Sequence, residues 1–321
     1  MSTGLAIPVF CASLAATLAA TVVFARELDR LSERLGVSEG LHGILTALGA
    51  DAPEIATAVA ALLSSRSKIG VGVVVGSNVF NLAALLGLSA VVAGRVRIHR
   101  HGLLLNGAVA LAVTGLAVAL VLGSIGAVAA TVLLLVVFVP YVLLLARPPR
   151  QGLLATAVHE EVDDLDTGEH PATATRADAL ALAGALGLIV LGSVGMVHAA
   201  EDLGRRWGVS DVIVGTLVLA AVTSLPNLLT AVRLALRGRG AATVSEAFNS
   251  NSLNVLAGIA VPALFLAIGS ANGVVTFSVW WLLGMTVVAV GLAYLGEGLR
   301  RAEGCVVIAL YVAFAAVIAT R

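Results

Sequence analysis

Two stretches of about forty residues repeat each other along the chain and limit what it can fold into. The first contains GADAPE at Gly49–Glu54 and GSNVFN at Gly76–Asn81, and the second contains VTSLPN at Val222–Asn227 and NSNSLN at Asn249–Asn254. The spacing from the proline to the first serine of the later motif is the same in both stretches. Each motif lies in an apolar segment long enough to cross a bilayer. A proline followed by a carboxylate or an amide is costly there unless these groups have a function.

The composition is that of an integral membrane protein. Hydrophobic residues make up 59% and charged residues 12% of the 321 residues, and the mean hydropathy is +1.03, whereas a soluble domain has about 25% charged residues. Lys plus Arg and Asp plus Glu both number 19, so the net charge does not indicate a nucleic-acid partner. Ten apolar segments of about 20 residues predict ten transmembrane helices, at residues 5–25, 39–63, 70–93, 102–121, 125–146, 177–199, 210–234, 243–268, 274–295 and 303–320.

A polar connection at residues 148–176 separates the first five predicted spans from the other five. Its prolines and acidic run indicate a solvated linker rather than a regulatory cation site, because no regular calcium-loop spacing is present. Since five is odd, two homologous halves must have opposite orientations, as in transporters that bind substrate near the midplane between inverted repeats. We predict an all-α integral membrane protein with a five-helix repeat at 1–147 (motifs at 43–82) and an inverted repeat at 177–321 (motifs at 215–255).

The distribution of basic residues predicts the orientation in a cell membrane. Of the 19 Lys and Arg residues, 14 lie in the loops that follow the odd-numbered spans. Cytoplasmic loops carry an excess of Lys and Arg. We therefore expect the central linker to be cytoplasmic and both termini to lie outside.

Only three acidic residues, Asp51, Glu54 and Glu246, fall well inside the predicted spans. A charge at the bilayer centre costs about 3 kcal/mol on insertion scales. Asp51 and Glu54 are three positions apart and share a helix face, so they repel each other unless a cation bridges them or one takes up a proton. Pro53 and Pro226 each remove a backbone hydrogen bond and free carbonyl oxygens in the preceding turn. A kinked packing helix would explain one proline, but not two at matched positions beside polar residues.

Hydroxyl and amide side chains in the same motifs supply neutral oxygen atoms. These side chains are Ser77, Asn78, Asn81, Ser250, Asn251, Ser252 and Asn254. Calcium and sodium prefer sites of this all-oxygen kind. For Asn78, Asn251 and Ser252, a hydrogen bond between helices is an equally good explanation. His42 and His198 lie near span ends, which indicates interfacial positions more than a proton relay.

With these motifs the chain resembles the calcium/cation antiporter superfamily, and its sodium/calcium exchanger branch in particular. The two α-repeats of that family typically read G-T-S-x-P-E and G-S-N-x-x-N, and Thr223–Pro226 and Gly76–Asn81 match these patterns. The resemblance implies an antiporter, not an enzyme, that exchanges calcium for sodium, or for protons, by alternating access and without a cofactor. It also implies that Glu54 is the central ligand, surrounded by Ser77, Asn81, Thr223, Ser224, Ser250 and Asn254.

The chain departs from the family pattern in its charged positions. Asp51 stands where a serine is usual, Asn227 replaces the second glutamate, and Asn254 replaces an aspartate that is frequent in exchangers. Glu246 stands where a neutral residue is usual. If Asp51 faces the pocket, the site keeps two negative charges for one divalent ion; if it points away, a monovalent ion or a proton fits better. The predicted ligands are Asp51, Glu54, Ser77, Asn81, Thr223, Ser224, Asn227, Glu246, Ser250 and Asn254.

Two other classes of protein use comparable features. A cation channel would contain the same buried oxygens but would conduct cations down their gradient without a counter-ion. A non-transporting relative with an altered site is the other alternative, and Asn227 in place of a glutamate is consistent with it. An intramembrane aspartyl protease needs two facing aspartates, whereas Asp51 has no aspartate counterpart inside another span. Zinc-type spacings, nucleophile elbows, phosphate loops and dinucleotide fingerprints are absent from the sequence. The expected partners are inorganic cations and the lipid bilayer.

Overall fold

The computed structural model describes residues 3–34, 39–147, 152, 158, 176–269 and 271–320. The predicted linker at 148–176 therefore lies almost wholly outside the described residues. The first half contains α1 (Thr3–Arg34), α2 (Glu39–Leu63), α3 (Ser67–Asn81), the π-helical η1 (Leu82–Leu88), α4 (Ser89–Ala93), β1 (Arg95–Arg97), α5 (Arg100–Val121) and α6 (Ala127–Ala146). The second half contains α8 (Arg176–Trp207), α9 (Asp211–Ile213), η2 (Val214–Leu219), α10 (Ala220–Thr223), α11 (Leu225–Leu236), α12 (Gly240–Val255), η3 (Leu256–Ala260), η4 (Pro262–Leu264), α13 (Gly273–Gly296), β2 (Gly298–Arg300) and α14 (Arg301–Ala319).

The two halves repeat the same series of helices. α1 and α8 each contain 32 residues. The distance in sequence from the start of α1 to the start of α8 is the same as that from α3 to α12 and from α5 to α13. This constant offset extends the repeat seen in the motifs to the helices that surround them.

Each of the ten predicted apolar segments coincides with one helix or with one run of consecutive helices. By length and composition, eight helices of the described chain can cross a membrane, or nine if the bent pair Asp211–Thr223 and Leu225–Leu236 is one span. The predicted segment at 243–268 corresponds to α12, η3 and η4 and does not pass this test. The reason is that α12 carries a glutamate and several serines and asparagines, although every one of its residues is buried.

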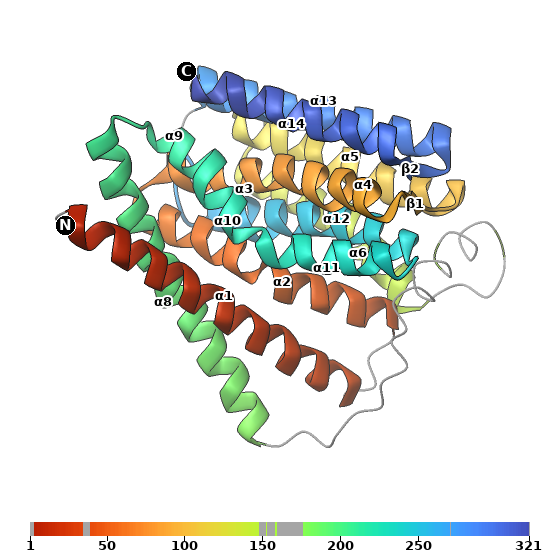
Figure 1. Ribbon diagram of the computed structural model, residues 1–321, viewed down its shortest axis with the longest axis horizontal. Helices are drawn as coiled ribbons and strands as arrows, with labels where there is room; N and C mark the ends of the chain where they lie inside the picture. The colour runs from red at the N-terminus through yellow and green to blue at the C-terminus, as the bar shows by residue number, and fades with distance from the viewer. Residues whose placement is uncertain are drawn as a thin grey trace.

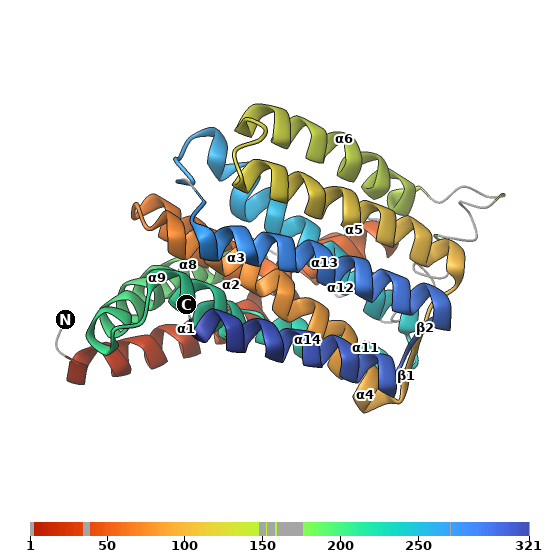
Figure 2. The same cartoon turned by 90° about the horizontal axis from the view of Figure 1, so that it is seen from above.

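The helices that carry the motifs lie in the middle of the bundle. α1 and α8 pack along each other on one side, and α13 and α14 lie on the opposite side in Figure 1. α3 and α12 pass between these two groups, and nearly all of α3 is buried. Figure 2 shows α6 at an outer edge beside α5, with which it packs. The polar side chains of the motifs are therefore buried inside the bundle.

Two short strands, which the sequence analysis did not anticipate, form an antiparallel pair. β1 follows α4 and β2 follows α13, and Val96 is paired with Leu299. Gly298 has a φ of +111°, and a Cβ at this position would overlap the Val96 carbonyl oxygen. Both the backbone conformation and the close approach therefore require glycine here.

Asn78 in α3 and Asn251 in α12 mark the axis that relates the two halves. Their separation in sequence is 173 positions, the same offset that separates equivalent helices. The Asn78 Nδ2 donates to the Asn251 backbone oxygen at 3.0 Å, and the Asn251 Nδ2 donates to the Asn78 backbone oxygen at 3.1 Å. Two equivalent residues that contact each other reciprocally must lie beside the two-fold axis between the repeats.

The two motif prolines affect their helices differently. α2 continues through Pro53 without a break. In the second half, α10 ends at Thr223, α11 begins at Leu225 with Pro226 in its first turn, and the two arms are bent by 46°. A proline in the first turn of a helix loses no hydrogen bond, whereas one inside a helix loses one. The sequence predicts a loosened helix turn at both prolines, but the helix is broken only at Pro226.

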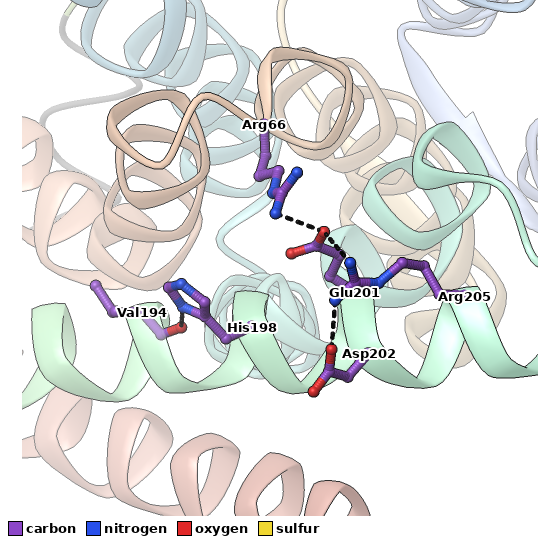
Figure 3. Close-up of polar contacts among 6 residues, drawn as sticks. All are labelled: Arg66, Val194, His198, Glu201, Asp202 and Arg205. Atoms are coloured by element: carbon purple, nitrogen blue, oxygen red, sulfur yellow. Dashed lines mark hydrogen bonds and ion pairs between the residues drawn. The ribbon is translucent and has the colours of Figure 1, made fainter. Parts of the chain in front are cut away.

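An ion pair joins α8 to the turn between α2 and α3, as Figure 3 shows. Arg66, in that turn, lies 2.8 Å from a carboxylate oxygen of Glu201, which also lies 3.6 Å from Arg205. The Glu201 side chain is buried. His198, one turn earlier, bonds instead to a backbone oxygen of its own helix and is exposed (Figure 3), which fits an interfacial position better than a relay.

Glycines allow α3 and η2 to approach each other closely. A Cβ at Gly76 would overlap the backbone carbonyl of Thr216, and a Cβ at Gly215 would overlap that of Ile69. Small residues at such contacts let membrane helices pack backbone against backbone. The contact also fixes the position of Ser77, the residue after Gly76.

Replacing Gly76 with alanine should destabilise the protein, because the atom that the new methyl group meets is backbone and cannot rotate away. We expect G76A to lower the free energy of unfolding by about 2 kcal/mol or more, measured by thermal unfolding of the purified protein in detergent. Gly115→Ala is the matched control, because a Cβ there meets nothing within 4 Å and alanine favours a helix. Equal melting temperatures for the two variants would contradict the close contact.

Candidate cation-binding site

The motif residues meet where α2, α3, α11 and α12 pack against one another. α2 supplies Asp51 and Glu54, α3 supplies Asn81, α11 supplies Asn227, and α12 supplies Ser250 and Asn254. All six side chains have 0% of their surface exposed. The arrangement brings residues from both repeats into one buried polar group.

Asn227 lies at the centre of this group. Its Nδ2 donates to Asp51 Oδ1 at 2.6 Å and to Glu54 Oε1 at 3.1 Å, and it also lies 3.1 Å from Ser250 Oγ. The Ser250 hydroxyl donates to the same Asp51 oxygen at 2.5 Å. An amide nitrogen has only two protons to donate. Three oxygen atoms therefore converge on one amide NH₂ group, which has only two protons to share among them.

The remaining amides extend the group on both sides. The Asn254 Nδ2 donates to Glu54 Oε2 and, at 3.3 Å, to Asn78 Oδ1. The Asn81 Nδ2 donates to Ser250 Oγ at 2.9 Å. Asp51 thus faces the pocket rather than away from it, and each carboxylate is held by amide or hydroxyl donors from the second repeat.

Several oxygen atoms of this group have no donor. Among the described residues, the buried oxygens without a hydrogen-bond partner include Asp51 Oδ2, Asn81 Oδ1, Asn227 Oδ1 and Asn254 Oδ1. A buried polar atom without a partner costs about 1–3 kcal/mol. Unpaired acceptors gathered at one place indicate that a positively charged partner belongs there, and an all-oxygen set is what hard cations prefer.

The protein itself does not supply this positive charge. Within the described ranges, no Lys, Arg or His forms an ion pair with Asp51 or Glu54. The described residues also contain no group of three or more His, Cys, Asp or Glu side chains that could hold a metal ion. A cation would therefore be held by two carboxylates together with neutral amide and hydroxyl oxygens.

The other predicted ligands, Ser77, Thr223, Ser224 and Glu246, are also buried. The hydroxyls of Thr223 and Ser224 each donate to the backbone oxygen one helical turn earlier, at 2.8 Å, which leaves their lone pairs available. Ser77 is buried in α3 without a hydrogen bond. Glu246 lies one helical turn before Ser250 in α12 and is not bonded to the group.

Asn78 and Asn251 make the hydrogen bond between helices that the sequence allowed for them. They bond to each other across the axis, and Asn78 also accepts from Asn254. Their spacing in sequence is the repeat offset that Glu54 and Asn227 also share. A second buried network, in which Tyr141 donates to Asn106 at 2.8 Å, carried no such repeat signal.

An inverted-repeat membrane protein with a polar site between its repeats has the architecture of a secondary transporter. The family described as "Sodium/calcium exchanger protein" matches residues 5–147 and 178–320 of the chain. The chain belongs to this family of membrane cation antiporters, so it is a transporter and not an enzyme. The resemblance inferred from the motifs is confirmed.

Individual relatives agree with this assignment. The chain is 26% identical over 302 residues to the "Putative antiporter CaxA" of Alkalimonas amylolytica, covering 88% of this chain and 89% of that protein. The solved structure of the sodium-calcium exchanger NCX_Mj, soaked with sodium and calcium, matches with a TM-score of 0.63 and 21% identity, covering 97% and 98% of the two chains. The structure of the H+/Ca2+ exchanger CAX matches with a TM-score of 0.75 and 14% identity, covering 98% and 85%. Both structures share the fold of this chain.

Replacing Asn227 with aspartate should make the protein depend on a bound cation, because it removes the shared donor and adds a third carboxylate. We expect N227D to lower the free energy of unfolding of the ion-free protein by about 2 kcal/mol. Calcium should then raise the melting temperature of N227D by more than that of wild type, in thermal unfolding with chelator or with calcium.

Asn272→Asp is the control for this substitution. Asn272 caps α13 through its side-chain oxygen, and aspartate caps a helix equally well. N272D should therefore melt like wild type with and without calcium. An ion-free N227D protein as stable as wild type would show that Asn227 does not hold the two carboxylates together.

Proposed function

We propose that the chain exchanges calcium for sodium across a cell membrane by alternating access at the site between its repeats. The observation that supports this most is the group of donor-free oxygens around two buried carboxylates, Asp51 and Glu54. Two negative charges match one divalent cation. Both charges come from α2, and the second repeat contributes neutral oxygens.

Calcium would replace the amide nitrogen that now holds the carboxylates. Calcium takes six to eight oxygen ligands at about 2.3–2.6 Å. Rotation of the Asn227 amide would turn its free Oδ1 toward the ion, and Asn81 and Asn254 also have a free amide oxygen. Pro53 leaves the Gly49 carbonyl without its usual donor within α2. Glu54, Asp51, Asn227, Ser250 and Ser224 would then contact calcium or the sodium ions that compete for the same oxygens.

Alternating access would be provided by a movement of the α1–α8 pair across the core. The two helices meet through small residues, and a Cβ at Gly192 or Gly195 would crowd Thr17 or Ser13 of α1. They pack more extensively on each other than on any other element of the described chain, so they would move as a unit (Figure 1). Such a movement would expose the site first to one side and then to the other.

The orientation and the counter-ion belong to this proposal. The excess of arginine in the loops after odd-numbered spans supports a cytoplasmic linker with both termini outside. Sodium is the counter-ion that an all-oxygen site without histidine supports. Proton coupling is the competing candidate, because a carboxylate pair can also release a cation by taking up a proton.

Removing either site carboxylate should impair calcium transport. We expect Glu54→Gln to abolish radioactive calcium uptake into proteoliposomes under an outward sodium gradient. Asp51→Asn should reduce the initial rate on the order of tenfold or more, because it removes a charged ligand but leaves Glu54 in place. Glu297→Gln, at an exposed site paired with Arg100, is the matched control and should transport like wild type.

The same vesicles distinguish the alternatives. Calcium uptake driven by a pH gradient in the absence of sodium would show that the counter-ion is a proton and not sodium. Calcium flux without any counter-ion gradient would indicate a channel, and no flux or binding would indicate a non-transporting relative. Full activity of Glu54→Gln would contradict the proposed site.

A further inference from the structure

Near its C-terminal end, α8 carries a buried carboxylate that bonds to a residue outside its own helix. Glu201 is 4% exposed, and its Oε1 lies 2.8 Å from the guanidinium of Arg66, in the turn between α2 and α3 (Figure 3). A buried carboxylate is costly unless a positive group pairs with it, and removing one partner of such a pair is strongly destabilising. The Arg66–Glu201 ion pair therefore favours the helix arrangement in which these two side chains meet.

The two partners belong to parts of the molecule that the proposed function requires to move relative to each other. The Arg66 backbone N–H donates to the Ala61 oxygen at 2.8 Å, and the Arg66 oxygen accepts from the Gly70 N–H at 3.0 Å. Arg66 is therefore fixed to α2 and α3, which carry site residues. Glu201 is fixed to α8, which packs mainly on α1. A shift of one helical turn, about 5.4 Å, would separate the two side chains.

Arg205 gives the carboxylate a second partner, which stays on the same helix. Its guanidinium lies 3.6 Å from Glu201 Oε1, one turn later in α8, and 2.5 Å from Asp202 Oδ1. If α8 moved away from Arg66, Arg205 would move with Glu201 and keep the carboxylate paired. The ion pair with Arg66 can therefore break without leaving an isolated negative charge inside the protein.

The other end of the α1–α8 pair has no matching connection among the described residues. Arg239 stands at the repeat offset from Arg66 and begins α12 as Arg66 begins α3, but it forms no ion pair within the described ranges. The buried Glu27, toward the C-terminal end of α1, bonds to Arg30 of its own helix at 2.7 Å. Inverted repeats place equivalent arginines at opposite ends of a molecule. The described ion pairs therefore connect α1 and α8 to the core at one end alone.

We propose that the Arg66–Glu201 ion pair is a latch, which holds this end of α8 against the core and disfavours opening of the site on the side of Arg66. This inference rests on the proposed function, in which α1 and α8 move across the core. α3 begins beside Arg66 and leads through η1 and α4 to β1, so the latch lies at the end of the molecule opposite the two strands (Figure 1). With both termini outside, as proposed above, this is the outer side. Both residues are positioning residues that act on the helices, not on the ion.

The test compares calcium uptake from the two sides of the membrane, in sealed right-side-out and inverted vesicles from cells that express the full-length protein, under the counter-ion gradient that drives it. Arg66→Gln and Glu201→Gln each remove the latch, so a larger fraction of the protein should open on the outer side. An apparent dissociation constant equals the intrinsic one divided by the fraction of protein that can bind. We therefore expect both variants to lower the KM for calcium about fivefold on the outer side and to raise it about twofold on the inner side.

The shared direction of the two variants separates a latch from a simple charge effect. Arg66→Gln removes a positive charge and Glu201→Gln removes a negative one, so an effect on the local cation concentration would shift KM in opposite directions. The double variant should resemble either single variant, because both remove the same contact. Lys68→Gln is the control, since Lys68 is an exposed cation in the first turn of α3 and should leave both KM values unchanged. Arg66→Lys, which keeps the charge, should lie between wild type and Arg66→Gln.

Opposite shifts in the two single variants would overturn the latch, and so would KM values that stay unchanged or change equally on both sides. Loss of uptake from both sides in either variant would show that the ion pair is needed for folding and not for the choice of side, which would also overturn it. Wild-type vesicles without counter-ion-driven calcium uptake from either side would instead overturn the proposed function itself.

Discussion

Two carboxylates held in the apolar middle of a helical bundle are the constraint on which the rest of the structure depends, because no Lys, Arg or His of the described residues pairs with either of them. Asp51 and Glu54 lie on one face of α2, fully buried, and their hydrogen-bond donors are amides and a hydroxyl. Such an arrangement is costly unless an ion is the missing partner. The apolar outer helices, the close glycine contacts and the polar central helices all serve to keep this pair dry and positioned.

The inverted repeat explains where the donors come from. A residue near the two-fold axis meets its own equivalent from the other half, as Asn78 and Asn251 do. Glu54 and Asn227 are also equivalent and bond to each other. The fold is nearly symmetric, but the charges are not, because one half carries the carboxylates and the other half mainly neutral oxygens. The site is therefore asymmetric within a nearly symmetric fold: α2 of the first half carries Asp51 and Glu54, and the second half supplies neutral ligands.

Sequence reasoning identified the helical class, the two halves and most of the polar residues that meet, because hydropathy and a repeat of constant offset can be read directly from the chain. The family assignment was also correct, and the finer choice of counter-ion stays a prediction. Other features depend on three-dimensional context. The break at Pro226 but not at Pro53 depends on where each helix begins. The β1–β2 pairing joins segments from different halves of the chain. The burial of α12 arises from packing, since its own composition is too polar for a span.

The central claim is that the donor-free oxygens of both repeats bind one divalent cation. The most direct measurement is a crystal structure of the protein with calcium, in which the anomalous scattering of the ion locates it. The account predicts a single calcium ion within about 2.3–2.6 Å of carboxylate oxygens of both Asp51 and Glu54, with the Asn227 amide rotated to present its oxygen. Calcium bound elsewhere, with Asn227 still donating to both carboxylates, would contradict it.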